Sequence, residues 1–536
     1  MKTYVFSPLV RFSLPFRPMI WLVCLLLALP SCSDSNADRG SEFRLSISNE
    51  PPTLDWTLAT DSVSFKVLTN LMEGLTQYNA DLEPIPAVAK SWEFSEDGKV
   101  IRYYLRKDAF WSDGKPVTAQ DFEYSWKRLL NPETAAQYAY FLFDLENAAE
   151  YNSGKIKDPS KVGVKALADD VLEVRLKRPV VYFPSITTFM VTYPQRQDIV
   201  EAYGDKWTEP ENIVTNGPFT LATWEHEYKL ELVANDRHFE GRPAIDLVTM
   251  YVVEERTTAL TLYETGELEL IELPPVAIPH YREHPEFAKM PQLRGYYYGF
   301  NVKKPPFDDV RVRQAFAHSI DRAQLPRILN GEEIPASSWI PKGMFGYNPD
   351  IGLKFDPEKA LRLLAEAGYP QGQGLPTVTA VYNTQNRNRL IAEFLQGQWK
   401  EHLGISVLLE SMEWKVFLSK LDTDPPQLFR LGWGADFPDP ENFMNLFIST
   451  SGNNRLQWAN RQYDELVERG PAITDPKQRQ ELYDEAQRIL TETDAAMIPL
   501  FISMQNMLIK PYVKGLELNS MEMLYLKRIH LEKDVS

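Results

Sequence analysis

The sequence predicts an α/β protein with mixed sheets, built from lobes that use discontinuous segments of the chain. Apolar residues alternate with a period of two in early strands, such as residues 99–106 and 230–234, whereas residues 377–433 follow the pattern β-α-β-α-β. Strands that alternate with helices indicate a parallel sheet with right-handed crossovers. Beyond an N-terminal segment of 31 residues, the remaining 505 residues suffice for two or three domain cores.

Residues 1–31 are predicted to be a signal peptide and not part of the fold. Their charged residues are all positive: Lys2, Arg11 and Arg17. Residues 19–30 form a mostly apolar run that is too short to span a bilayer and is typical of a secretory signal. Ser31 and Cys32 follow, as in a bacterial lipoprotein signal, so we expect residues 32–43 to be a lipidated N-terminus and linker, with the lipid on Cys32. The alternative is an ordinary cleaved signal with an unmodified Cys32.

Charge and cysteine content narrow the possible functions. Removal of the signal would leave Cys32 as the sole cysteine, which excludes an intrachain disulfide, a Cys-ligated metal site and thiol catalysis. The net charge would change from −17 to −20, and such an acidic protein is a poor partner for nucleic acid or anionic lipid. The aromatic content of 12% fits either large cores or a ligand cleft with aromatic walls.

Local patterns define the elements of the first half of the chain. Strands are predicted at residues 43–48, 99–106, 219–224 and 245–253, and a helix at residues 62–73. Residues 49–55 contain two prolines, which indicates an extended edge segment. Thr118 and Asp121 predict a capping box at the start of a helix that ends at Asn131 and Pro132.

The second half is richer in helices. Asp356, Pro357 and Gly368 are the N-cap, first-turn and terminal residues expected of one helix. Further helices are predicted at residues 309–321, 388–403, 413–421, 442–447 and 477–492. Strands are predicted at residues 377–382, 405–410, 427–433 and 496–503.

The last strand of the β-α-β-α-β pattern, residues 427–433, carries the candidate site. It contains Arg430 and Trp433, and it is followed by Asp436 and then by two prolines that cannot continue a sheet. In open α/β sheets, ligands bind at the carboxyl ends of strands, near the point where the strand order reverses. Asp436 is therefore a candidate ligand-binding residue. The alternative is that Asp436 only caps the following turn.

The sequence contains few catalytic or metal-binding patterns. His226-Glu227 lacks the second histidine of a zinc-protease motif, and neither a G-x-S-x-G elbow nor a phosphate-binding P-loop occurs. His280 and His284 have a spacing suited to a metal only if that segment is helical, and prolines bracket them, so a solvated turn is favoured. We therefore expect a binding protein with no cofactor and no metal.

Motifs spread along the chain resemble one known family. They include AVAKSW at residues 87–92, FWSDGKPVTAQDF at 110–122, TNGPF at 215–219, PPFDDVRVRQAF at 305–316 and GWGAD at 432–436. In this order they resemble the extracellular solute-binding proteins of family 5, the peptide-binding components of ABC importers, and within that family the oligopeptide-binding proteins. The likeness runs from about residue 44 to 530, which makes it far more specific than any single motif.

The resemblance implies the two-lobed periplasmic-binding-protein fold, in the class that carries an extra domain. Residues 44–62, 188–293 and 504–532 would form the first lobe. Residues 63–187 would form the inserted extra domain. Residues 294–503 would form the second lobe, which carries the site for the amino group of the ligand.

The resemblance also assigns site residues. It gives Asp436 the role of pairing with the α-ammonium of a peptide, with Trp433 lining the cleft. Gly432 and Gly434 would let the backbones approach closely. Tyr138 matches a cleft aromatic of the other lobe, and Glu50 lies on the matching edge segment.

Of four further residues, two match the family pattern with an alternative left open, and two depart from it. Arg430 matches a cleft arginine that can take the carboxylate of a short peptide, or it forms an internal salt bridge. Asn388 and Leu421 stand where cationic partners of the carboxylate occur in the family. Trp414 is either a pocket wall or part of the core.

The implied function is that of a lipid-anchored, monomeric receptor in the periplasm or cell envelope. It would close on a peptide by hinge bending and deliver it to an ABC permease in the inner membrane. Alternatives on the same fold are a nickel or haem complex, an oligosaccharide or a murein peptide as ligand. An exported hydrolase is a third class, which the missing catalytic groups disfavour.

Overall fold

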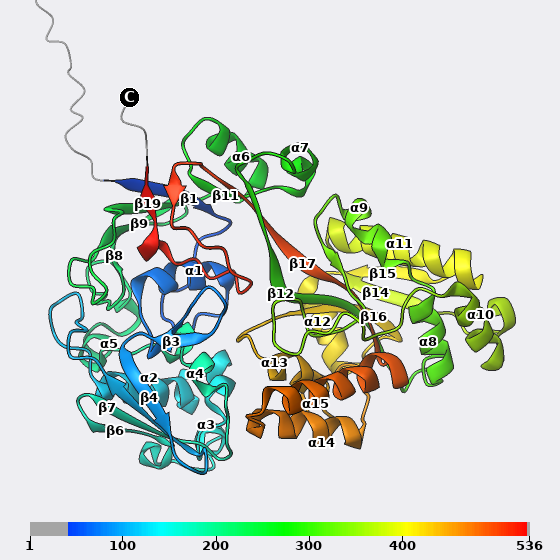
Figure 1. Cartoon of the computed structure of the whole chain (residues 1–536), viewed down its shortest axis with the longest axis horizontal. Coiled ribbons are helices and arrows are strands. Elements are labelled where there is room, and N and C mark those ends of the chain that lie inside the picture. Colours follow the sequence, from blue (N-terminus) through cyan, green and yellow to red (C-terminus); the bar gives the residue numbers. More distant parts are fainter. Residues whose placement is uncertain (1–40, 533–536) are drawn as a thin grey trace, which may run out of the picture. The chain divides into compact units, whose positions relative to one another are not determined.

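The computed structural model describes residues 41–532, without the side chain of Lys415. The predictions for the signal peptide and for Cys32 concern residues outside this range. The helices and strands of the described range are those of a mixed α/β protein with several sheets (Figure 1).

The strands form one large mixed sheet and three smaller sheets. In spatial order the large sheet contains β15 (Leu408–Met412), β14 (Thr379–Asn383), β16 (Leu428–Gly434), β12 (Phe287–Phe300), β17 (Met497–Ile509), β11 (Leu270–Glu272), β1 (Glu42–Ile47), β10 (Leu247–Val252), β9 (Lys229–Ala234) and β8 (Phe219–Glu225), with β13 (Ile334–Pro335) paired to β17. The smaller sheets are β4 (Ala89–Phe94), β5 (Val100–Leu105), β7 (Val171–Arg175) and β6 (Val164–Ala168); β2 (Thr76–Tyr78) and β3 (Pro84–Pro86); and β18 (Val513–Lys514) and β19 (His530–Leu531).

The helices are concentrated in the second half, as the sequence predicts. The α-helices are α1 (Ser62–Leu71), α2 (Ala119–Leu130), α3 (Ala148–Asn152), α4 (Phe183–Ile186), α5 (Gln197–Tyr203), α6 (Arg256–Glu264), α7 (Ile278–Tyr281), α8 (Val310–His318), α9 (Leu325–Leu329), α10 (Pro357–Glu366), α11 (Asn386–Leu403), α12 (Trp414–Thr423), α13 (Glu441–Met444), α14 (Arg461–Arg469) and α15 (Pro476–Arg488). Two short 3₁₀ helices also contribute to the site, η2 (Gln137–Leu142) and η4 (Met190–Thr192).

Two long antiparallel strands, β12 and β17, join the two halves of the large sheet. The end of β12 pairs with β16, and the end of β17 pairs with β11, while the two strands pair with each other over most of their length. Figure 1 shows them side by side, β12 in green and β17 in red. The ladder is interrupted between Pro291 and Gly295, close to the predicted lobe boundaries at residues 293 and 503. The division of the chain into lobes stays a prediction.

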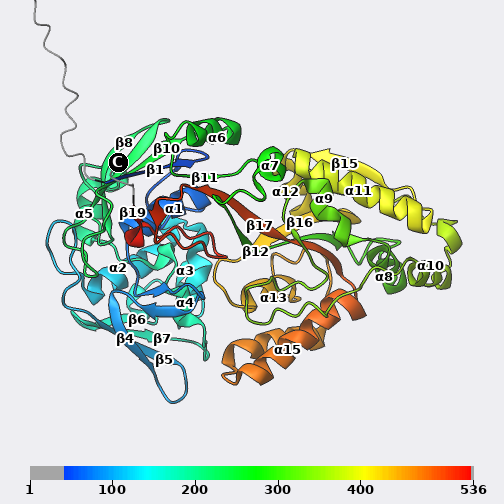
Figure 2. The same ribbon diagram turned by 45° about the horizontal axis from the view of Figure 1, so that its top comes forward.

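The β-α-β-α-β prediction for residues 377–433 is confirmed. β14 lies between β15 and β16 and is parallel to both, so the strand order reverses at β14. Figure 2 shows α11 beside β15 at this end of the sheet. Ile391, Leu395 and Trp399 of α11 belong to the same core cluster as Ala380 of β14. The carboxyl ends of β14 and β16 therefore border the switch point at which ligand sites form.

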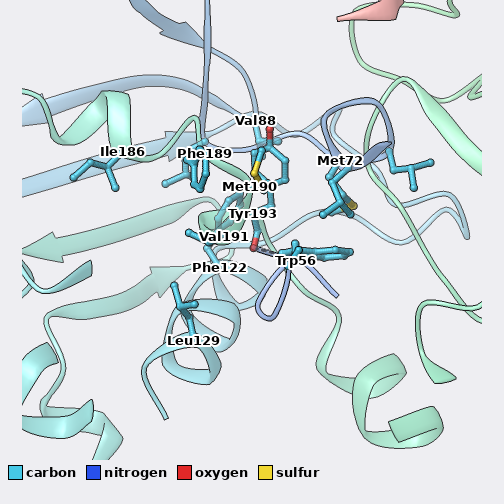
Figure 3. Packing of buried hydrophobic residues seen from close by; sticks show 14 of the residues in the cluster. Trp56, Met72, Val88, Phe122, Leu129, Ile186, Phe189, Met190, Val191 and Tyr193 are labelled. Carbon is cyan, nitrogen blue, oxygen red and sulfur yellow. Dashed lines mark hydrogen bonds between the residues drawn. The ribbon is translucent and has the colours of Figure 1, made fainter. Parts of the chain in front are cut away.

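The first half packs around one large apolar cluster. The helix α2 begins with the predicted capping box of Thr118 and Asp121, and it buries Phe122, Trp126 and Leu129. Figure 3 shows Phe122 and Leu129 in the cluster together with Trp56, Phe189 and Met190. Because Phe189 and Met190 also line the cavity described below, the wall of that cavity is anchored in the core.

Several predicted boundaries differ from the observed ones. β15 begins at Leu408 and not at residue 405; Ile405 and Val407 precede the strand and are buried in the core. α8 ends at His318 and not at residue 321, although Ile320 is buried as expected. β17 extends to Ile509 because it pairs in turn with β12, β13 and β11.

Candidate ligand-binding site

A cavity of about 410 Å³ lies at the carboxyl end of β16. Its walls come from α1, η2, η4, the middle of β12, the end of β16 and residues 520–523. The aromatic members are Phe65, Tyr138, Phe189 and Trp433. The charged members are Lys66, Arg294, Asp436 and Glu522. Its size and mixed lining suit a small polar ligand with apolar side chains.

β16 reaches this cavity with one of its backbone edges unpaired in the described range. Along one edge it pairs with β12 from Leu428 to Gly434. Along the other edge β14 pairs with Leu428 and Phe429 but not with the later residues of β16. Gly432, Trp433 and Gly434, which lie beyond the last β14 pair, line the cavity. A free strand edge beside a cavity is the geometry that accepts an added peptide strand.

Asp436 follows β16 and is held by side chains of the neighbouring turn and of η2. Its N–H donates to Asn442 Oδ1 at 3.0 Å, and its Oδ2 accepts from Asn442 Nδ2 at 3.4 Å and from the Tyr140 hydroxyl at 3.2 Å. Trp433 Nε1 also donates to Asn442 Oδ1, at 3.0 Å, so Asn442 links the two site residues. Within residues 41–532 no cation lies within ion-pair distance of the Asp436 carboxylate.

The electrostatic state of Asp436 follows from this environment. Burial raises the pKa of Asp436 to about 6, and the hydrogen bonds from Asn442, Tyr140 and Tyr138 offset that rise only in part. Burial disfavours a charged carboxylate, whereas an adjacent cation would favour it. At neutral pH the cavity therefore holds a mostly ionised carboxylate that a cationic ligand would stabilise.

A second cavity, of about 270 Å³, lies on the other side of Trp433 and Asp436. It contains Tyr140, Tyr182 and Phe437, the last two stacked at 5.1 Å between ring centroids. Glu441 lines it and is buried; burial and the acids Asp144 and Asp439 raise the pKa of Glu441 to about 8, although two arginines oppose them. Asp436 thus stands between two cavities of different chemistry.

Gly432 is required by close packing inside the sheet. A Cβ on this residue would lie 2.9 Å from the carbonyl oxygen of Gly295 in the neighbouring strand β12, and backbone atoms cannot yield as a side chain can. A Cβ on Gly434 would meet only the Arg294 side chain, at 3.3 Å. Both glycines line the cavity.

Arg430 and Asn388 lie together in a separate buried network. Arg430 Nη1 donates to Asn383 Oδ1 at 3.0 Å, and the guanidinium lies 4.6 Å from the centroid of the Tyr296 ring. Asn388 Nδ2 donates to Asn383 Oδ1 at 2.8 Å, and Asn388 Oδ1 accepts from the Tyr296 hydroxyl at 3.0 Å. Among the described residues Arg430 forms no ion pair, so the internal salt bridge considered for it is absent there. Neither residue is among those lining the two cavities.

The structure places three other candidates away from the cavity. Glu50 accepts hydrogen bonds from Trp224 Nε1 at 2.8 Å and from the backbone of Glu227 at 3.0 Å, so it holds its segment against the β8–β9 turn. Trp414, at the start of α12, is 45% exposed. Leu421 is buried in a core cluster that also contains Phe417. The exposed Trp414 therefore does not belong to the core, and it lines neither of the two cavities.

Sequence reasoning missed residues that contact the site from other elements. Tyr140 lies two residues from the predicted Tyr138, and its hydroxyl reaches Asp436 from a segment 296 residues away in the chain. Asn442 was covered by the predicted helix of residues 442–447 but carried no signal of a site. Lys66 lies on the predicted helix of residues 62–73, where a lysine on a helix surface is unremarkable.

The described residues also bear on metal binding and on membrane insertion. Within residues 41–532 no group of three or more His, Cys, Asp and Glu residues is placed to hold a metal ion. No helix in that part of the chain has the length and apolar character needed to cross a membrane.

The fold and the cavity together define a class of protein. Two parts of one mixed sheet, joined by two long strands and meeting at a cavity lined from both parts, are the two-lobed fold of the periplasmic solute-binding proteins. The chain belongs to the bacterial extracellular solute-binding proteins of family 5, whose model for the middle region matches residues 83–455.

Individual relatives sharpen this assignment. The chain is 34% identical to the oligopeptide-binding protein OppA of Bacillus subtilis over 84% of this chain and 85% of that protein. It is 32% identical to the probable deoxycholate-binding periplasmic protein YgiS of Escherichia coli, over 96% of this chain and 99% of that protein. The solved structure of the murein tripeptide binding protein MppA of Escherichia coli is similar with a TM-score of 0.77 at 31% identity, covering 92% of this chain and 99% of that chain.

Proposed function

We propose that this protein captures peptides with a free α-amino group in the cavity at the end of β16 and delivers them to an ABC importer. The carboxylate of Asp436 is the observation on which the proposal rests. It is largely removed from water, it has no cationic partner among the described residues, and its pKa is raised to about 6. A bound α-ammonium would supply the missing charge, and such pairs are favourable when the site holds the acid in place.

The backbone of the peptide would extend β16 along its free edge. Main-chain hydrogen bonds of an added strand give affinity without regard to the sequence of the peptide. The unpaired edge beyond Phe429 and the two glycines of the cavity support this mode, because they leave room for a second backbone. Tyr138 and Trp433 would contact the ligand from opposite walls.

The names of the relatives leave the class of solute open between peptides and a bile acid. Deoxycholate is an anion at neutral pH, and an anion beside Asp436 would add a second negative charge to a site that already disfavours one. Like charges in a partly buried site oppose each other strongly. The charge of Asp436 therefore favours a ligand with a cationic end.

The remaining features of the proposal concern location and partners. We assign residues 44–62, 188–293 and 504–532 to a first lobe, residues 63–187 to an extra domain and residues 294–503 to a second lobe. The protein would act as a monomer without catalytic turnover. It would be held at a membrane by a lipid on Cys32 and would meet the permease at the inner membrane.

The test is peptide binding by Asp436→Asn. Native mass spectrometry of protein purified without denaturation first identifies the ligands that copurify. Calorimetry with those peptides then compares the wild-type protein with the variant. Loss of a buried charged partner typically costs about 2–5 kcal/mol, so we expect the Kd to rise at least about thirtyfold.

N-acetylation of the peptide supplies the complementary test. It removes the ammonium and should weaken binding to the wild-type protein as much as Asp436→Asn does. Asp205→Asn is the matched control because Asp205 is exposed and lies outside both cavities. Equal affinity for the free and the acetylated peptide would remove Asp436 from the proposed role.

A further inference from the structure

The charged residues of the 410 Å³ cavity divide into one pair and two unpaired groups. Arg294 Nη2 lies 3.2 Å from Glu522 Oε2, so these two neutralise each other. Asp436 has no cation within ion-pair distance in the part of the chain that the structure describes. Lys66 is the fourth charged residue of the cavity, and within residues 41–532 its ammonium has neither an ion pair nor a hydrogen bond. The cavity therefore presents one uncompensated negative and one uncompensated positive charge.

Lys66 is placed in the cavity by the geometry of α1. Ser62, Phe65, Lys66 and Thr69 line the cavity, and these positions form one face of a helix. Val67, Leu68 and Leu71 are buried on the opposite side. The nearest acid in sequence, Asp61, is already used as the N-cap of the helix, where it accepts from the backbone of Val63 and Ser64. Local sequence thus offers Lys66 no counter-ion.

Asp436 and Lys66 border the cavity at different places. Asp436 also lines the 270 Å³ cavity, whereas Lys66 also lines a small cavity of about 50 Å³ together with Glu522 and Met523. The two neighbouring cavities share no lining residue. A ligand that fills the central cavity can therefore meet the two charges at two separate points.

We infer that Lys66 binds the terminal carboxylate of the ligand, so that the preferred ligand is a short zwitterionic peptide with both termini free. This inference rests on the proposed function, because it assumes that the ammonium of the peptide pairs with Asp436. A zwitterion of matching length would neutralise both charges at once. A longer or blocked peptide would leave one of the two charges unpaired in a partly buried site. The free-energy cost of that unpaired charge adds to the selectivity for peptides with both termini free.

The position of Arg430 supports this assignment. The resemblance gave the carboxylate to Arg430, but its guanidinium is bonded to Asn383 and lies over the Tyr296 ring, and Arg430 does not line the cavity. Lys66 has no such competing partner among the described residues. The cation that selects the carboxylate therefore lies on α1 and not on β16.

The experiment uses mixtures of short peptides of random sequence, from dipeptides to pentapeptides. Each mixture is offered as free acids, as C-terminal amides or as N-acetylated peptides, and native mass spectrometry measures which species the full-length protein retains. We expect the wild-type protein to prefer free acids over amides at least about tenfold at one or two neighbouring lengths. Lys66→Met should abolish that preference by weakening the binding of free acids, while amides should bind the variant at least as tightly as the wild-type protein.

The controls separate this inference from the proposed function. Methionine keeps the apolar stem and a similar helix propensity, so Lys66→Met should fold, and Lys66→Arg should keep the preference. Lys157→Met removes an exposed positive charge outside the cavity and should change nothing. If no peptide is retained, or if N-acetylation has no effect, the proposed function fails. If peptides bind and N-acetylation weakens them, but Lys66→Met keeps the preference for free acids while Arg430→Met loses it, only the role of Lys66 is overturned.

Discussion

Asp436 and Glu73 are both acids that are largely removed from water, but their pKa values are shifted in opposite directions. Glu73 Oε1 lies 2.7 Å from the ammonium of Lys527 and 3.3 Å from His238 Nε2. Burial alone would raise the pKa of Glu73, but Lys527 and His238 lower it to about 2. Among the described residues Asp436 has no such partner, and its pKa is raised to about 6. The fold therefore places a cation beside the structural acid Glu73, whereas the described part of the chain places none beside the acid of the cavity.

The difference identifies which charge is available to a ligand. Lys527 is also bonded to Gln77 Oε1 at 2.6 Å and lies 3.0 Å from Glu240 Oε2, so the Glu73 cluster is satisfied on several sides. The Glu73–Lys527 ion pair connects the C-terminal segment to the segment that follows α1. A buried acid that is fully paired stabilises the fold, and one left unpaired at neutral pH costs stability unless a ligand arrives.

The largest effect is expected from Lys527→Met, which would leave Glu73 buried without its lysine and with His238 Nε2 at 3.3 Å as a weaker partner. Breaking one partner of a buried pair typically costs about 3–5 kcal/mol, so the urea and thermal unfolding midpoints should fall clearly at pH 7. The loss should shrink below about pH 5, because Glu73 without Lys527 can then be protonated. Peptide affinity should stay unchanged, since Lys527 lines neither cavity.

Lys477→Met is the control, because the side chain of Lys477 is 87% exposed. A loss below about 1 kcal/mol would show that the pair is replaceable.

Asp436→Asn should affect the stability of the ligand-free protein in the opposite direction. The folded pKa of Asp436, about 6, lies above the value of about 3.9 for an unfolded chain, so the ionised carboxylate destabilises the fold and does so fully above pH 6. The variant should therefore be more stable than the wild-type protein at pH 7, by up to about 3 kcal/mol, and equal to it near pH 4.

Denaturation of both proteins at several pH values measures this difference. Ligand must first be removed, because bound peptide would stabilise the wild-type protein alone. A variant that is less stable than the wild type at pH 7 would mean that the carboxylate holds the turn after β16, which is the capping role first considered for it.

Local sequence was sufficient to predict the strand, the turn and the acid of the site. The apolar run that becomes β16 is bounded by prolines and glycine, and the alternation of helices and strands implied the parallel order that places its end at a switch point. The helix α10 was equally predictable, because Asp356 caps it and Pro357 begins it. Such signals are local and need no knowledge of the rest of the fold.

The contacts that complete the site come from distant segments and could not be predicted in this way. Tyr140 reaches Asp436 across 296 residues, and Lys66 faces the cavity only because α1 packs with its other face on the core. Glu50 had been placed near the ligand by resemblance, yet its bonds to Trp224 and Glu227 depend on the β8–β9 turn. Arg430 likewise depends on Asn383 and Tyr296 from two other strands.

The smallest effect is expected from Tyr140→Phe, which removes one hydrogen bond from Asp436 without removing its charge. The hydroxyl donates to Asp436 Oδ2 at 3.2 Å and so favours the ionised form. Its loss should raise the pKa of Asp436 above about 6 and weaken peptide binding at pH 7 by about 0.5–1.5 kcal/mol. Because binding needs the ionised acid, affinity should fall as the pH drops through this pKa, and the midpoint of that fall should lie at higher pH in the variant. Calorimetry from pH 5 to 8 measures the peptide affinity and the midpoint of its pH dependence. Tyr203→Phe is the control, because Tyr203 is 47% exposed and lies outside both cavities. An unchanged midpoint would mean that Tyr140 fills space beside Asp436 but does not tune its charge.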